Sequence, residues 1–163
     1  MRDIPEQIRL IIFDADGTLR RTTVAGKPCP HAPGEWELMP KVKEALSGVN
    51  WRERDLALGV ASNQDQVAYG HLSERMAYQL LEEMICAATG CDSTSVTIRF
   101  CPHALEVDCR CRKPEPGMLI EIMRSRGVAP SETMFVGDSE NDCEAARRAG
   151  VSFVWARDFF EWE

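Results

Sequence analysis

The chain has 163 residues, of which 44% are hydrophobic and 28% are charged, with a formal net charge of −7. This length suits one domain with a substantial core. The acidic balance, without a stripe rich in Lys and Arg, makes nucleic acid an unlikely partner. No stretch approaches the roughly 20 apolar residues of a membrane span, so we expect no membrane partner.

Seven cysteines and a short apolar run near the N-terminus bear on the cellular compartment. The run ends in aspartates, which is typical of a buried strand and not of a signal peptide. Without a secretory signal, the cysteines indicate reduced thiols or metal ligands before they indicate disulfides. We therefore expect a cytoplasmic protein.

Apolar patterns predict alternating strands and helices along the chain. Residues 8–14 are apolar and β-branched and end on an acid, as in a strand buried on both faces of a parallel sheet. Residues 17–40 are rich in Gly, Pro and Thr and predict a loop. Further strands are predicted at 55–62, 95–100, 133–138 and 151–156, and helices at 40–49, 73–88, 116–127 and 140–150.

This alternation predicts an α/β fold with a doubly wound, Rossmann-like parallel sheet. In such a sheet, ligands bind at the carboxyl ends of the strands. The residues that stand at those ends are Asp14, Ser62, the region of Cys101, and Asp138. The polar candidates are therefore expected at one edge of the sheet.

Two pairs of acids follow predicted strands. Asp14 and Asp16 stand in "DADGT", and Asp138 and Asp142 stand in "GDSEND" one helical turn apart. Each pair alone is compatible with a turn or a helix cap. Together, carboxylates at the mouths of two strands repel one another and need a cation, and oxygen ligands suit Mg²⁺.

Two shorter motifs carry groups that bind anions. Ser62 and Asn63 in "ASNQ" can donate hydrogen bonds to an anion at the end of a strand, although both residue types are also common helix caps. Arg112 and Lys113 in "RKP" are two adjacent cations, which in isolation are more often a solvated surface.

The order of these motifs is more specific than any one of them. "FDADGT", "ASNQ", "RKP" and "VGDSEND" resemble the four motifs of the haloacid dehalogenase-like phosphohydrolases, from about residue 8 to residue 155. The resemblance implies a phosphatase, with Asp14 attacking phosphorus to give an aspartyl-phosphate. Asp16 would protonate the leaving oxygen and then activate water. Mg²⁺ would be held by Asp14, the main-chain carbonyl of Asp16, and Asp138.

The same resemblance assigns the remaining motif residues. Ser62, Asn63 and Lys113 would bind and neutralise the transferring phosphoryl group, and Asp142 would fix Lys113. An aspartate at position 16 favours a phosphatase over a dehalogenase within the family. The close spacing of the motifs leaves no room for a large cap domain, so one domain over residues 1–163 is expected.

A group of thiols and one imidazole precedes the lysine. Cys101, His103, Cys109 and Cys111 form C-x-H-x₅-C-x-C, an arrangement that suits a closed, structural tetrahedral Zn²⁺ site in an inserted loop at about residues 101–111. The alternative is a set of reduced thiols that bind nothing. A second "CPH", at Cys29 to His31, has no Cys or His nearby in the sequence and is interpreted as loop, with His31 as a minor candidate for contact with substrate.

"SNQ", "CPH" and "CRCRKP" together resemble a narrower branch, the D,D-heptose bisphosphate and histidinol-phosphate phosphatases. That resemblance implies a small phosphorylated substrate, a phosphorylated sugar in the first case, and a role for Arg112 in holding substrate phosphate. The span between His103 and Cys109 is shorter than in that branch. Alternatives are a nucleotide or nucleic-acid-end phosphatase and a catalytically idle binding module. Arg20 and Arg21 could contact a second anionic group or lie in a solvated loop.

Overall fold

A central parallel sheet organises the computed structural model, which describes residues 3–91 and 95–163. Its strand order is β5-β4-β1-β6-β7. The strands are β1 Leu10–Phe13, β4 Ala57–Asn63, β5 Val96–Cys101, β6 Thr133–Gly137 and β7 Ser152–Trp155. The predicted doubly wound α/β fold is confirmed.

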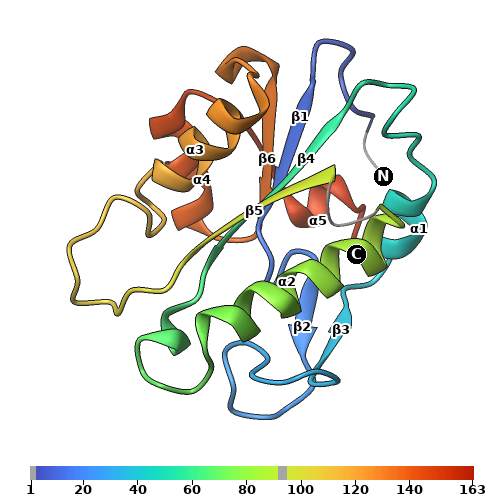
Figure 1. Cartoon of the computed structure of the whole chain (residues 1–163). Coiled ribbons are helices and arrows are strands. Elements are labelled where there is room, and N and C mark those ends of the chain that lie inside the picture. The colour runs from blue at the N-terminus through green and yellow to red at the C-terminus, as the bar shows by residue number, and fades with distance from the viewer. Residues whose placement is uncertain (1–2, 92–94) are drawn as a thin grey trace.

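Helices cover both faces of this sheet (Figure 1). On one face, α1, α2 and α5 pack against buried side chains from all five strands. On the other face, α3 and α4 pack against side chains that alternate with these along the strands. The helices are α1 Val42–Ser47, α2 Glu74–Thr89, α3 Gly117–Arg126, α4 Glu140–Ala149 and α5 Ala156–Phe159, with 3₁₀ turns η1 Asp65–Val67 and η3 Pro130–Glu132.

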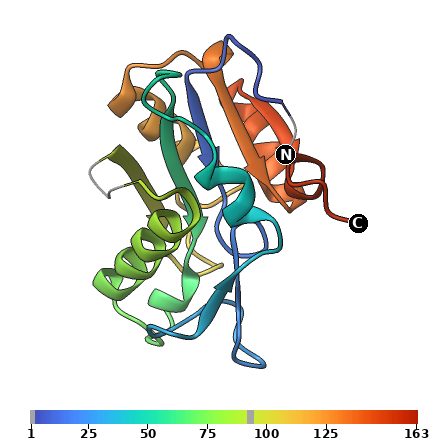
Figure 2. The same ribbon diagram turned by 90° about the vertical axis from the view of Figure 1, so that its right-hand side faces the viewer.

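The region predicted as loop, residues 17–40, contains a second, two-stranded sheet. Strand β2, Arg20–Thr22, pairs antiparallel with β3, Trp36–Leu38, and the pair extends from one end of the main sheet (Figures 1 and 2). The loop prediction was wrong for these residues because three-residue strands are too short to show an apolar alternation. The Gly- and Pro-rich segment between the two strands remains without regular structure.

Strand β1 lies at the centre of the main sheet and fixes where the acidic motifs meet. Phe13 lies opposite Val60 of β4 and Val136 of β6. The main-chain N–H of Asp14 continues this pairing by donating to the Val136 carbonyl at 2.9 Å. The carboxyl ends of β1, β4 and β6 therefore lie at the same edge of the sheet, as the sequence predicts, with β4 continuing beyond Val60 to Asn63.

Neither a cap domain nor a transmembrane helix is present in the described part of the chain. The segments between the motifs form the strands of the sheet and the helices that cover it, and the β2–β3 pair is the one additional sheet among residues 3–91 and 95–163. None of the described helices is both long enough and apolar enough to cross a bilayer.

Gly59 in β4 allows α3 to approach the sheet. A Cβ at this position would lie 2.8 Å from Cγ2 of Ile122 and 3.2 Å from Cγ1 of Ile12. We expect Gly59→Ala to lower the free energy of unfolding by about 1–3 kcal/mol through overpacking. Urea titration followed by circular dichroism measures the change.

Gly48 provides the matched control. It ends α1 with φ −82, and a Cβ there would lie 3.7 Å from the nearest atom, the Glu44 carbonyl oxygen. Gly48→Ala should leave stability unchanged or slightly raise it. Equal effects of the two substitutions would contradict the packing argument.

Candidate active site

The motif residues line one open cavity of about 220 Å³ at the carboxyl ends of the strands. The sequence places them far apart, and the neighbouring carboxyl ends of β1, β4 and β6 bring them together. The predicted residues on its wall are Asp14, Asp16, Ser62, Asn63, Lys113, Asp138 and Asp142. Arg112 is the predicted substrate-binding residue that is not part of this wall.

Lys113 lies at the bottom of the cavity with its ammonium between two aspartates. Its Nζ lies 2.5 Å from Oδ1 of Asp14 and 2.7 Å from Oδ1 of Asp142, and it donates to the Ala61 carbonyl at 2.8 Å. The lysine side chain is 3% exposed. Burial opposes its charge, but the two carboxylates outweigh burial and raise the pKa of Lys113.

Asp14 follows the last residue of β1 and is itself buried. Burial raises the pKa of its carboxyl group to about 8, against the charge of Lys113 and with the repulsion of Asp142 and Asp138 adding to the rise. The site thus holds more negative than positive charge. A further cation beside Asp14 would let the carboxylate ionise at neutral pH.

The acids at this point are spaced for a metal ion. Oxygens of Asp14, Asp138 and Asp142 lie within 4.8 Å of one another. Three carboxylates and one lysine leave an excess of about two negative charges, which a divalent cation would balance. Oxygen ligands in an open cavity fit Mg²⁺, so the residues present are compatible with the predicted magnesium site.

The carboxylate oxygens of Asp142, however, already bind donors from the protein. Its Oδ2 accepts hydrogen bonds from Ser139 Oγ at 2.7 Å and from the main-chain N–H groups of Asp138 and Ser139. Its Oδ1 faces Lys113. Both Asp142 oxygens are therefore engaged within the protein, and the role of this residue in orienting the lysine stays a prediction.

Two glycines make the close approach of these acids possible. Gly17 has φ +93, and a Cβ there would lie 2.2 Å from Oδ2 of Asp138. A Cβ on Gly137 would lie 2.6 Å from the Cβ of Asp142. Side chains at either position would push an acid out of the cavity.

Ser62 and Asn63 have different surroundings although they are adjacent. Ser62 Oγ accepts a hydrogen bond from Gln64 Nε2 at 2.8 Å and faces the cavity. The Asn63 amide donates to the Lys113 carbonyl at 3.1 Å and accepts from the Lys113 N–H at 3.0 Å. Asn63 therefore fixes the main chain of Lys113 in this structure, and its predicted contact with phosphate stays a prediction.

Asp16 faces the cavity but not the acid group, because two other side chains hold it. Arg20 Nε donates to its Oδ1 at 2.8 Å, and Arg20 Nη2 donates to Oδ2 at 3.3 Å. Gln64 Nε2 donates to Oδ2 at 2.8 Å. Neither partner is predicted from the sequence, because Gln64 has no assigned role in "ASNQ" and Arg20 lies in a segment interpreted as loop.

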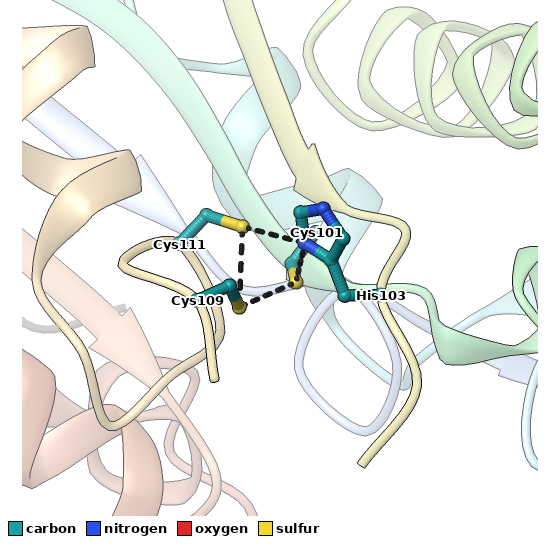
Figure 3. Close-up of side chains that lie close together, drawn as sticks. All are labelled: Cys101, His103, Cys109 and Cys111. Carbon is teal, nitrogen blue, oxygen red and sulfur yellow. Dashed lines mark hydrogen bonds between the residues drawn. The ribbon is translucent and has the colours of Figure 1, made fainter. Parts of the chain in front are cut away.

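The predicted zinc ligands form a second compact cluster (Figure 3). Cys101 ends β5, and His103, Cys109 and Cys111 come from the following loop, with all four side chains pointing toward one another. Cys109 Sγ lies 3.7 Å from Cys101 Sγ and 3.6 Å from Cys111 Sγ. His103 Nδ1 lies 3.4 Å from Cys101 Sγ and 3.2 Å from Cys111 Sγ.

These separations fit a tetrahedral metal site. Zinc with Zn–S bonds of about 2.3 Å and a Zn–N bond of about 2.0 Å holds its ligand atoms roughly 3.5–3.8 Å apart. Burial raises the pKa of the Cys101 and Cys111 thiols. For Cys109, burial is outweighed by main-chain N–H donors of Arg112 and Cys111, and its pKa falls to about 7. Several thiolates at this site would need a cation.

The thiol cluster is joined directly to the lysine segment. The main-chain N–H of Arg112 donates to Cys109 Sγ at 3.4 Å, and Lys113 follows in the chain. Arg112 Nη2 lies 3.4 Å from Oδ2 of Asp65 in η1. Its Nη1 is buried and has no hydrogen-bond partner among the residues described.

The second "CPH" also lies close to another histidine, which the sequence did not predict. The rings of His31 and His71 stack at a centroid distance of 5.3 Å and an interplanar angle of 4°. Cys29 is buried, and burial together with the charge of Asp16 raises its pKa to about 12. These three residues do not form a metal-ligand group in the described structure.

Comparison with known proteins agrees with the motifs. The profile of the haloacid dehalogenase-like hydrolases matches residues 20–150. The chain therefore belongs to this family, and the expected enzyme class, a phosphatase, is confirmed by relatives that carry that name.

Two of these relatives are D-glycero-beta-D-manno-heptose-1,7-bisphosphate 7-phosphatases. The protein of Bordetella bronchiseptica is 31% identical over 145 residues, which cover 89% of this chain and 78% of the relative. The protein of Pseudomonas aeruginosa is 34% identical over 141 residues, or 85% of this chain and 75% of the relative.

A solved structure is similar as well. The crystal structure of D,D-heptose 1,7-bisphosphate phosphatase from B. bronchiseptica, complexed with magnesium and phosphate, aligns with a TM-score of 0.72 and 29% identity. The alignment covers 90% of this chain and 79% of that structure.

The raised pKa of Asp14 gives a pH-dependent stability. The pKa is about 3.9 in an unfolded chain and about 8 in the folded protein, so the folded state binds more protons between these values. Without Mg²⁺, the free energy of unfolding should fall by up to about 1.4 kcal/mol per pH unit as pH rises through this window. Asp14→Asn should remove this slope, so that the variant becomes more stable than the wild type near pH 8.

Urea unfolding at several pH values tests this, with Asp158→Asn as the control. Asp158 is 54% exposed and pairs with Arg157 at the surface. Asp158→Asn should keep the wild-type slope. If the free energy of unfolding depends on pH in the same way in the wild type and in Asp14→Asn, then ionisation of Asp14 is not the cause of the slope.

Proposed function

We propose that this chain is a Mg²⁺-dependent phosphomonoesterase that works through an aspartyl-phosphate on Asp14. The observation that carries the proposal is the arrangement of Lys113 between Asp14 and Asp142 with Asp138 beside them. It presents a carboxylate nucleophile next to fixed positive charge, with further carboxylate oxygens that could hold a divalent cation. Such a site suits the transfer of a charged phosphoryl group.

In the first step, an Asp14 oxygen forms a bond to phosphorus as the bond from phosphorus to the leaving oxygen breaks. Asp16 supplies the proton that the leaving oxygen takes. In the second step, water attacks the same phosphorus, Asp16 takes the proton from the water, and the Asp14–phosphorus bond breaks. Bound Mg²⁺ would neutralise phosphoryl and carboxylate charge, held by Asp14, Asp138 and the Asp16 carbonyl.

Lys113 and Ser62 would hold the phosphoryl oxygens. Lys113 is fixed by Asp142 and by the Asn63 amide, so its ammonium needs little reorganisation during the reaction. The Ser62 hydroxyl accepts from Gln64 and can turn its own proton toward the cavity. These residues provide the donors of the site with a fixed geometry.

A phosphorylated sugar, of the heptose bisphosphate kind, is the proposed substrate. The similarity to heptose bisphosphate phosphatases covers most of the chain. Arg112, beside the catalytic lysine, has a buried Nη1 without a partner among the described residues. The Arg112 side chain as a whole is 21% exposed, and its exposed part would bind a second anionic group of the substrate.

We further propose that Zn²⁺ at Cys101, His103, Cys109 and Cys111 is a structural staple within a single catalytic domain. A closed set of four ligands leaves no position for substrate. The link from Cys109 to the Arg112 N–H means that closure of this loop sets the path of the chain into Lys113.

Asp14→Asn tests the nucleophile. The amide cannot form the aspartyl-phosphate, so phosphate release from p-nitrophenyl phosphate or a sugar phosphate should fall by at least about 10³-fold with Mg²⁺ at saturation. Phosphate release is followed colorimetrically, and circular dichroism checks the fold. Turnover like that of the wild type would disprove the mechanism.

Cys109→Ser tests the staple, with Cys143→Ser as the control. Cys143 lies in α4 and is not part of the thiol cluster. Elemental analysis should find one zinc ion per chain in wild type and Cys143→Ser, and far less in Cys109→Ser. The Cys109 variant should also lose activity with excess Mg²⁺, because Lys113 is less well fixed. Full zinc content in Cys109→Ser would rule out this site.

A further inference from the structure

Arg20 is a completely buried cation whose task nothing described so far explains. It is 1% exposed and is among the largest fully buried side chains of the protein. Burying a guanidinium is costly unless it is paired, so its partner matters. That partner is Asp16, the residue proposed to move protons in the reaction.

The ion pair is bidentate and approaches Asp16 from inside the protein. Arg20 Nε donates to Oδ1 at 2.8 Å and Nη2 donates to Oδ2 at 3.3 Å, which uses both carboxylate oxygens. The Asp16 side chain is 20% exposed, against 1% for the arginine. The Asp16 carboxylate is therefore partly exposed to the cavity, while the buried Arg20 guanidinium binds it from the protein interior.

Gln64 makes the two oxygens of Asp16 unequal. Its Nε2 donates to Oδ2 at 2.8 Å, so Oδ2 has two donors and Oδ1 has one. A carboxylate offers about four lone-pair sites, two on each oxygen. Oδ2 is therefore fully used, and Oδ1 keeps a lone pair to hold a proton.

The main chain of Arg20 is tied to the same turn as Asp16. Its N–H donates to the Ala15 carbonyl at 3.0 Å, and its carbonyl accepts from the Gly17 N–H at 2.8 Å. Arg20 also begins β2 and lies opposite Leu38 of β3. The guanidinium is thereby held at a fixed place relative to Asp16.

We propose that Arg20 is a positioning residue that, with Gln64, directs Oδ1 of Asp16 at the leaving group and the water. This inference rests on the proposed function. In the first proposed step, the leaving oxygen takes a proton from Oδ1 as the phosphorus–oxygen bond breaks and the bond to Asp14 forms. Oδ1 then accepts a proton from water as the water oxygen bonds to phosphorus and the Asp14–phosphorus bond breaks, which restores the starting state.

The role predicts a dependence on the leaving group. An alkoxide needs a proton to leave, whereas p-nitrophenolate is a stable anion and does not. The value of kcat/KM reports the first chemical step. For glucose 6-phosphate, kcat/KM of Arg20→Met should fall at least about tenfold further than for p-nitrophenyl phosphate, with the loss in kcat and not in KM.

Arg21→Met is the matched control. Arg21 is the next residue of β2, its side chain is 60% exposed, and it pairs with Glu37 at the surface. This substitution should change kcat/KM for both substrates less than about twofold. Arg20→Lys, which keeps the charge but not the fork, should recover part of the activity toward the sugar phosphate.

A double-mutant cycle establishes whether Arg20 acts through Asp16. Asp16→Asn should show the same preference for the aryl phosphate. Adding Arg20→Met to it should cost no more than about twofold in kcat/KM for glucose 6-phosphate, the substrate on which Arg20→Met alone has the larger effect. Full additivity would overturn the proposal. Equal losses on both substrates in Arg20→Met would also overturn it, because they indicate a structural role alone.

Two outcomes separate this inference from the proposed function. If the wild type hydrolyses neither ester with Mg²⁺, the proposed function fails and the role of Arg20 fails with it. If the wild type is active but Arg20→Met does not fold, Arg20→Lys and Gln64→Met decide the matter. An unchanged preference for the leaving group in both folded variants would refute the positioning role.

Discussion

The buried ammonium of Lys113 is the constraint on which the active site depends. A charge taken out of water needs partners on every side, and here they come from the end of β1, the end of β4 and the start of α4. Those three places coincide only when β1 lies between β4 and β6 in the observed register. The pairing of Lys113 therefore depends on the order and register of the strands. A shift of β4 or β6 along β1 would leave the buried ammonium without one of its partners.

The carboxylates around Lys113 outnumber the cations, and the local packing holds these carboxylates close together. Gly17 and Gly137 allow Asp138 and Asp142 to approach where any Cβ would exclude them. Asp16 stands apart from this repulsion because Arg20 balances it. One group of acids is thus left in need of a metal, while the acid proposed for proton transfer is paired within the protein. This division of charge lets neighbouring carboxylates of one residue type perform different tasks.

Much of this could be predicted from the sequence because parallel strands end at one edge. The apolar run before Asp14 and the strand before Asp138 determined their meeting, and the spacing of Cys101, His103, Cys109 and Cys111 determined a compact cluster. Interactions that depend on a particular side-chain direction could not be predicted. The letters of "ASNQ" do not show that Asn63 faces the Lys113 main chain. The short, polar strand β2 concealed the burial of Arg20, and the meeting of His31 with His71 depends on two irregular loops.

The thiol cluster makes this protein sensitive to reagents that do not bind its carboxylates. The reaction site consists of hard oxygen ligands, which discriminate poorly among small divalent ions but bind soft metals weakly. The proposed zinc site beside it has three soft sulfur ligands and one imidazole, and its Cys109 accepts a hydrogen bond from the main chain of Arg112, the residue before the lysine. Copper(I), cadmium or an oxidant of thiols would therefore alter the loop that precedes Lys113 and so lower the proposed phosphatase activity, without competing for the carboxylates. The proposed reaction uses carboxylates, yet it would be sensitive to the soft metals and oxidants that react with thiols.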